Sequence, residues 1–228
     1  MEQTLDILSQ LGDGFLKTIL LFVITLVLSL PLGLLICLAS RSKFKPLSYL
    51  FKGIIWVIRG TPLMLQILVV SFIPLLLFNL MNKQIADFFN ISISSLLFVF
   101  VCIAFVINYA CYFAEIYRAG FESINKGQYE ASKVLNLSKT ETFFKIILPQ
   151  VIKRIIPPIG NEVITLVKDT SLAQILGVVE LLSAANHSVN QYVVLTPLLY
   201  AAIFYLLFTL LLTMLFSKIE KKLSYYEV

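Results

Sequence analysis

The sequence predicts an all-α polytopic membrane protein with five membrane-spanning helices, organised as a single transmembrane domain over residues 1–228. Of its residues, 59% are hydrophobic and only 14% are charged, against about 45–50% and about 25% in an ordinary soluble domain. Several apolar segments also approach the ~20 residues that a helix needs to cross a bilayer. Together these features exclude an ordinary soluble enzyme.

Four apolar segments are clear, at about residues 15–39, 54–80, 93–116 and 192–216. A fifth, at about residues 159–182, is long enough to span but contains Glu162, Lys168 and Asp169. The first segment exceeds the 7–15 apolar residues of a signal peptide, so we expect it to be retained as a spanning helix.

The basic residues predict the orientation. Most of the 18 Lys and Arg residues lie in residues 41–52, 118–154 and 218–222, whereas only Lys17 and Lys83 fall on the opposite side. Short loops rich in Lys and Arg stay in the cytoplasm, which predicts an external N-terminus and a cytoplasmic C-terminus. The net charge of +5 is thus explained by membrane topology, and we expect a lipid bilayer and no nucleic acid as the partner.

No residue pattern indicates a cofactor or a metal site. Cys37, Cys102 and Cys111 lie inside apolar segments without metal-ligand spacing, so we interpret them as small buried side chains. The chain also lacks a phosphate-binding Gly-x-x-x-x-Gly-Lys-Ser/Thr loop. Any ATP must therefore be hydrolysed by another subunit.

Residues 118–158 form the only polar region long enough to fold by itself, and they read as two short cytoplasmic helices joined by a turn. Ser138 and Glu141 have the spacing of a capping box, which predicts the start of the second helix. Pro149 should bend or end that helix.

A resemblance to a known family appears within this region. Glu130-Ala131-Ser132, then Asn136, then residues 146–149 ending in Leu148-Pro149 resemble the signature loop of bacterial ABC importer permeases. The family form is Glu-Ala-Ala, three residues, Gly, nine residues, Ile-x-Leu-Pro. Ser132 replaces the second Ala and Asn136 replaces the Gly, and Asn tolerates a left-handed turn better than other non-Gly residues.

The flanking residues resemble the polar amino acid subfamily, of histidine, glutamine and arginine type. They are residues 59–62 (Arg-Gly-Thr-Pro), 115–120 (Glu-Ile-Tyr-Arg-Ala-Gly), 126–128 (Lys-Gly-Gln) and 168–172 (Lys-Asp-Thr-Ser-Leu). The resemblance covers roughly residues 15–216.

The resemblance implies a type I ABC importer permease core in a bacterial cell membrane, without enzymatic activity of its own. Its implied partners are an ABC ATPase dimer, a second permease copy or paralogue, an extracellular or periplasmic binding protein and an amino-acid substrate. The short cytoplasmic helix would dock into the ATPase. The implied ATPase-coupling residues are Glu130, Ala131, Ser132, Asn136, Leu148 and Pro149.

Glu162 and Asp169 are the most informative charged pair in the apolar segments. Seven helical residues bring both to one face, about 10 Å apart by the ~1.5 Å rise. Charged membrane residues usually face a cavity or a partner, so we expect both to line the substrate pathway. The alternative is structural, with Glu162 paired to Arg154 or Lys168 and Asp169 paired to Arg59 or Lys168.

Three uncharged polar residues are further pathway candidates. Asn108 and Gln66 lie within apolar segments, where they would bind substrate or bond to neighbouring helices. Thr61-Pro62 has the form of an N-cap followed by proline, which predicts that the second segment breaks and restarts there.

The mechanism predicted is alternating access for a polar amino acid. A basic amino acid is favoured if both carboxylates line the cavity, and glutamine and cystine remain open. The alternative class is a stand-alone carrier or channel in which Glu162 and Asp169 bind protons or cations. The sequence leaves open whether the permease dimer has two identical chains.

Overall fold

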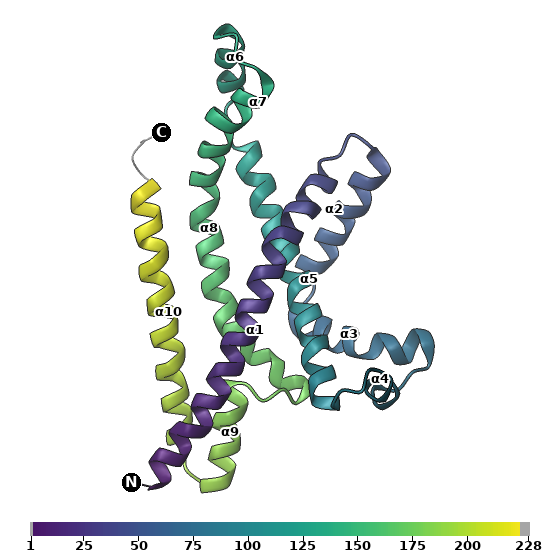
Figure 1. Cartoon of the computed structure of the whole chain (residues 1–228), viewed down its shortest axis with the longest axis vertical. Helices are drawn as coiled ribbons and strands as arrows, with labels where there is room; N and C mark the ends of the chain where they lie inside the picture. Colours follow the sequence, from purple (N-terminus) through teal and green to yellow (C-terminus); the bar gives the residue numbers. More distant parts are fainter. Residues whose placement is uncertain (1, 224–228) are drawn as a thin grey trace.

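The computed structural model describes residues 2–223, and these form helices joined by short connections (Figure 1). The α-helices in chain order are α1 (Glu2–Ser40), α2 (Lys45–Gly60), α3 (Leu63–Phe78), α4 (Asn82–Phe89), α5 (Ile93–Glu122), α6 (Lys126–Val134), α7 (Lys139–Glu141), α8 (Leu148–Asp169), α9 (Leu181–Tyr192) and α10 (Thr196–Leu223). A π-helix (Thr142–Ile147) precedes α8 and a 3₁₀-helix (Thr170–Leu176) follows it. The predicted all-α class is confirmed.

Three helices of the described chain, α1, α5 and α10, are long and apolar enough to cross a membrane, and α2 with α3 adds a fourth if the bent pair is one span. The expected fifth span is α8. Its 22 residues are long enough to cross a membrane, but they contain more charged residues than α1, α5 or α10 have in their apolar parts. In place of one helix over residues 159–182, α8 ends at Asp169 and a 3₁₀-helix follows it.

The predicted break in the second segment is confirmed, but the predicted cap is wrong. The axes of α2 and α3 differ by 114°. Pro62, not Thr61, is the residue before α3, and no side chain caps this helix. The Thr61 hydroxyl instead donates to the Val57 carbonyl at 2.9 Å, because that carbonyl in the last turn of α2 lacks a helical partner.

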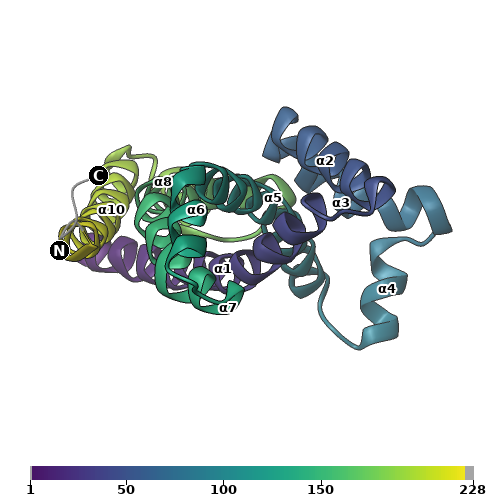
Figure 2. The same cartoon turned by 90° about the horizontal axis from the view of Figure 1, so that it is seen from above.

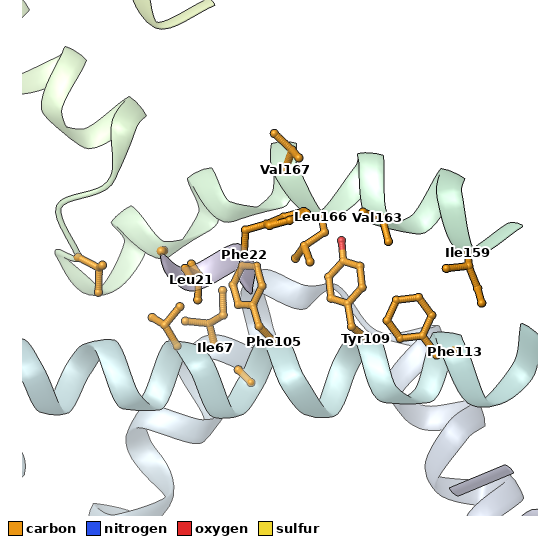
Figure 3. Packing of buried hydrophobic residues seen from close by; sticks show 14 residues of the cluster. Leu21, Phe22, Ile67, Phe105, Tyr109, Phe113, Ile159, Val163, Leu166 and Val167 are labelled. Atoms are coloured by element: carbon orange, nitrogen blue, oxygen red, sulfur yellow. The ribbon is translucent and has the colours of Figure 1, made fainter. Parts of the chain in front are cut away.

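The core lies where α5 meets α1, α3 and α8 (Figure 3). Phe105, Tyr109 and Phe113 repeat every four residues along α5, so they share one face and are buried together. They pack against Leu166 of α8 and Phe22 of α1. Since lipid tails are as apolar as these side chains, close packing holds the helices together.

Small residues on α1 bring its backbone close to α5. Thr25, Ser29 and Gly33 repeat every four residues and are all buried. A Cβ at Gly33 would lie 2.8 Å from the carbonyl oxygen of Ala110 and 2.9 Å from the Cβ of Phe113. Such a stripe of small residues is typical of helix interfaces in membranes.

The two ends of the molecule differ in character. The N-terminal end of α1 lies beside α9 at one end, whereas α6, α7 and the C-terminal end of α10 lie at the other (Figure 1). Seen from above, α3 and α4 extend away from the bundle on the side opposite α10 (Figure 2). The basic segments 41–45 and 126–145 therefore lie at the end away from the N-terminus.

Candidate functional site

The segment that contains α6 and α7 projects beyond the helical bundle as a helix–turn–helix (Figure 1). Helix α6 begins where the Asn125 side chain accepts a hydrogen bond from the Gly127 amide at 2.8 Å. It ends at a turn in which Asn136 has φ 52°, so the predicted left-handed turn is confirmed. The Leu137 amide donates to the Ser132 carbonyl at 3.0 Å and closes the turn.

The predicted capping box at the start of α7 is also confirmed. The Glu141 amide donates to Ser138 Oγ at 3.2 Å, and the Ser138 amide donates to Glu141 Oε2 at 3.2 Å. Lys145 Nζ donates to Glu141 Oε1 at 2.9 Å. The Lys145 hydrogen bond, with those from Ser138, lowers the pKa of the Glu141 carboxyl to about 2.

The residues predicted to couple to the ATPase do not all face outward. Glu130, Ala131 and Asn136 are exposed at the tip, whereas Ser132 is buried. Ser132 Oγ donates to the Gln128 carbonyl at 2.6 Å, so its small side chain allows α6 to pack on its own chain.

Leu148 and Pro149 begin α8, directly after the π-helix. Pro149 lacks a backbone N–H and occupies the first turn, where none is required. The helix therefore changes type at this proline and does not end there. Leu148 is half-buried and Pro149 exposed.

Two exposed apolar residues at the tip were not predicted. Val134 and Leu135 are 86% and 69% exposed, although they end a polar helix where nothing in the chain requires apolar side chains. The sequence did contain a signal for them, since two aliphatic residues stand directly before the Asn136 turn.

A cavity of about 330 Å³ lies between α2, α5 and α8. Its lining includes charged or polar side chains from all three helices: Arg59, Tyr112, Glu115, Ser123, Arg154 and Glu162. Glu162 is half-buried. The cavity thus holds one of the predicted pathway carboxylates.

Arginine side chains balance the acidic ones at this cavity. Arg118 binds Glu115 through two hydrogen bonds of 2.9 and 2.5 Å. Arg59 Nη1 lies 3.8 Å from the same carboxylate, and its guanidinium lies 5.2 Å from the centre of the Tyr112 ring. Arg154 donates to the Ser123 carbonyl.

Asp169 does not line this cavity. Its carboxylate accepts a hydrogen bond of 2.7 Å from the Tyr109 hydroxyl within the core, and Figure 3 shows this hydroxyl directed toward α8. Within residues 2–223, neither Glu162 nor Asp169 forms an ion pair within 4.0 Å. The suggested pairs with Arg59, Arg154 and Lys168 are therefore absent.

Gln66, Asn108 and Thr61 form one hydrogen-bond network. Asn108 Nδ2 donates to Gln66 Oε1 at 2.9 Å. Gln66 Nε2 donates to the Ile58 carbonyl at 2.7 Å and to Thr61 Oγ1 at 2.9 Å. The network joins α5 to the α2–α3 break, which favours the structural interpretation left open by the sequence.

Glu180 is a structural residue that the sequence analysis did not identify. Its side chain is buried and accepts hydrogen bonds from the Leu182 and Ser183 amides and from the Tyr205 hydroxyl, at 2.8, 2.6 and 3.0 Å. It caps α9 and ties this helix to α10. An acidic residue followed by Leu-Leu-Ser at a helix start was the available signal.

The described residues form an apolar helical domain with three or four candidate membrane spans and a projecting helix–turn–helix, as in an integral membrane protein. The sequence pattern described as "Binding-protein-dependent transport system inner membrane component" matches residues 7–225, nearly the whole chain. The chain belongs to this family. It is therefore the permease component of an ABC transporter, without ATPase activity of its own, and its partners include an ATPase and a binding protein.

Named relatives agree with this assignment. The chain is 33% identical to the L-cystine transport system permease protein TcyB of Bacillus subtilis, over 95% of this chain and 87% of the relative. It is 32% identical to the arginine transport system permease protein ArtQ of the same organism, over 93% and 91%. A solved amino acid ABC transporter with histidines matches with TM-score 0.83 at 28% identity, over 96% of each chain. These relatives place the chain in the polar amino acid branch of the family and confirm the predicted resemblance.

Proposed function

We propose that this chain forms half of the translocation pathway of an ABC importer for a polar amino acid, by alternating access driven by a partner ATPase dimer. A binding protein delivers the substrate on the external side. The relatives support this substrate class, because they include a cystine permease and an arginine permease and resemble this chain over almost its full length. The individual amino acid differs between these relatives, so the proposal stops at the class.

The observation that carries the proposal is the geometry of the cytoplasmic tip. Glu130 and Ala131 are exposed on a helix that the Asn125 cap, the Asn136 turn and the Ser138 capping box hold at fixed orientation. A rigid tip transmits a displacement of the ATPase to α8, because α7, the π-helix and α8 follow one another without a loop. The exposed Val134 and Leu135 described above supply an apolar contact beside it.

We propose five crossings, with α8 as the fifth. Helix α8 packs along α5 and α10, and its 22 residues extend about 33 Å at the ~1.5 Å rise. Of its charged residues, Arg154 and Glu162 line the cavity and Asp169 binds Tyr109 of α5, where charges are tolerated. The basic segments at the α6 end then lie in the cytoplasm and the N-terminus lies outside.

A second permease copy or paralogue completes the pathway in this proposal. Of the predicted pathway residues, Glu162 is the one that we propose contacts the substrate, because it lines a cavity together with charged side chains of both signs. Asp169, Asn108, Gln66 and Thr61 shape the pathway indirectly, since each is held by a hydrogen bond to another helix or to the α2–α3 break.

Replacing Ala131 by Trp tests the coupling role. The bulky ring should prevent close docking of the ATPase, so ATP-dependent uptake should fall to near background while membrane insertion is unchanged. Ala202→Trp is the matched control, because Ala202 is exposed on α10 away from the tip, and it should retain uptake. Uptake is measured in proteoliposomes that contain the permease, the ATPase, the binding protein and internal ATP.

Normal uptake by the Ala131→Trp complex would contradict the coupling role. Uptake that proceeds without ATP and follows an ion gradient would instead favour the stand-alone carrier.

A further inference from the structure

The cavity between α2, α5 and α8 presents charges of opposite sign from two helices. Arg59 comes from the end of α2 and Glu162 from the middle of α8, and both line the same cavity. They are not within the 4.0 Å of a direct ion pair. The cavity therefore separates a guanidinium from a carboxylate.

Glu162 lacks a partner within the described chain. No hydrogen bond or ion pair of residues 2–223 involves its carboxylate, although the residue is half-buried in the middle of α8. Leaving a charge unpaired in a partly desolvated site costs free energy. A ligand that brings a cation to this carboxylate recovers that cost.

Arg59 is also available to a ligand. Its contact with Glu115 is long, at 3.8 Å, and the Glu115 carboxylate is already bound by two hydrogen bonds from Arg118. The Tyr112 ring supports the guanidinium from one side, and within residues 2–223 the guanidinium donates no hydrogen bond. Arginine is well suited to this because its planar fork binds a carboxylate through two hydrogen bonds.

The size and shape of the cavity fit one small ligand. Its volume of about 330 Å³ is at the lower end of the roughly 300–1,000 Å³ range of small-molecule sites. Arg154, Pro158 and Glu162 repeat every four residues on α8 and all line it, so the cavity follows this helix toward the cytoplasmic tip. Glu162 lies about 12 Å deeper than Arg154 by the ~1.5 Å rise.

We infer that Arg59 and Glu162 form a subsite for the zwitterionic main-chain group of an amino acid, with the Arg59 guanidinium on the carboxylate and the Glu162 carboxylate on the ammonium. This inference rests on the proposed amino-acid transport function. Every α-amino acid carries these two groups on one carbon, so the subsite recognises what substrates share. It does not favour a basic side chain, because Asp169 lies outside the cavity and the two arginines balance the two glutamates.

The test measures ligand binding to the permease–ATPase complex in lipid nanodiscs without binding protein. The probes are L-arginine and L-glutamine, their α-carboxamides and their N-acetyl derivatives. The unaltered complex should bind each free amino acid roughly ten-fold or more tightly than either derivative, because each derivative removes one charge-assisted contact.

The variants separate the two charges. Arg59→Gln should weaken binding of the free amino acids roughly ten-fold or more and leave binding of the carboxamides unchanged, because the carboxamides lack the carboxylate that Arg59 binds. Glu162→Gln should weaken binding of the free amino acids and the carboxamides and leave binding of the N-acetyl derivatives unchanged, because these lack the ammonium. Arg59→Lys keeps the charge and should retain part of the preference, which guards against misfolding of Arg59→Gln. Lys52→Gln and Lys168→Gln, on the same helices but outside this cavity's lining, should bind like the unaltered complex.

Equal losses for all ligands would overturn the inference and give Arg59 or Glu162 a structural role. Absence of saturable binding to the unaltered complex would overturn it as well. Both outcomes leave the proposed function standing as long as the complete system takes up an amino acid with ATP. Loss of all ATP-dependent uptake by the complete, unaltered system would refute the proposed function itself.

Discussion

Gly33→Ala tests the close packing of α1 against α5. The added Cβ would lie 2.8 Å from the Ala110 carbonyl oxygen and 2.9 Å from the Phe113 Cβ. Both distances are shorter than van der Waals contact, and the first involves backbone, which cannot rotate away. The two helices must therefore separate.

The magnitude follows from a comparison within the same helix. Gly12 also lies in α1, but a Cβ there meets no atom within 4 Å. Both substitutions gain the same helix propensity, about 1 kcal/mol, so the difference between them isolates the packing cost. Overpacking costs typically about 1–3 kcal/mol. At about 2–4 °C per kcal/mol for a chain of this size, Gly33→Ala should melt roughly 2–12 °C below Gly12→Ala.

The assay uses the buried thiols as reporters. Cys37 and Cys111 are fully buried beside this interface, so a thiol-reactive dye follows its opening during heating in detergent. A Gly33→Ala protein that melts at or above the temperature of Gly12→Ala would refute the close-packing argument. At constant temperature, we also expect the dye to label both thiols faster in the Gly33→Ala protein than in the Gly12→Ala protein.

Two further predictions concern single residues. Asn136→Gly should preserve ATP-dependent uptake, whereas Asn136→Val should reduce it several-fold. Asn136 has φ 52°, and a β-branched residue is strained in that conformation. Similar uptake by both variants would contradict this prediction. Tyr109→Phe should lower the free energy of unfolding by about 1.5–3 kcal/mol, since Asp169 then loses its charge-assisted hydrogen bond. Tyr112→Phe is the control and should have little effect, because the Tyr112 hydroxyl makes no such bond in residues 2–223. Equal melting temperatures for the two variants would contradict the prediction.

Local patterns in the sequence determined the helical class and the helix–turn–helix of α6 and α7. The length of an apolar segment predicts a membrane span without knowledge of the segments that pack against it, because a bilayer imposes the same requirement on each segment. The Asn136 turn and the box of Ser138 and Glu141 depend on backbone groups within a few residues. The resemblance to the family's loop implied the turn, and the spacing of Ser138 and Glu141 predicted the box. The break near Thr61 was predicted for the same reason.

Contacts between distant segments were decided only by the tertiary structure. Helical periodicity places Glu162 and Asp169 on one face, but it does not say which helices pack against that face. Tyr109, 60 residues away, binds Asp169, and α2 brings Arg59 to the cavity of Glu162. Thus the sequence supplied the charged residues of the site, whereas helix packing determined which of them hold the fold and which remain open to a ligand.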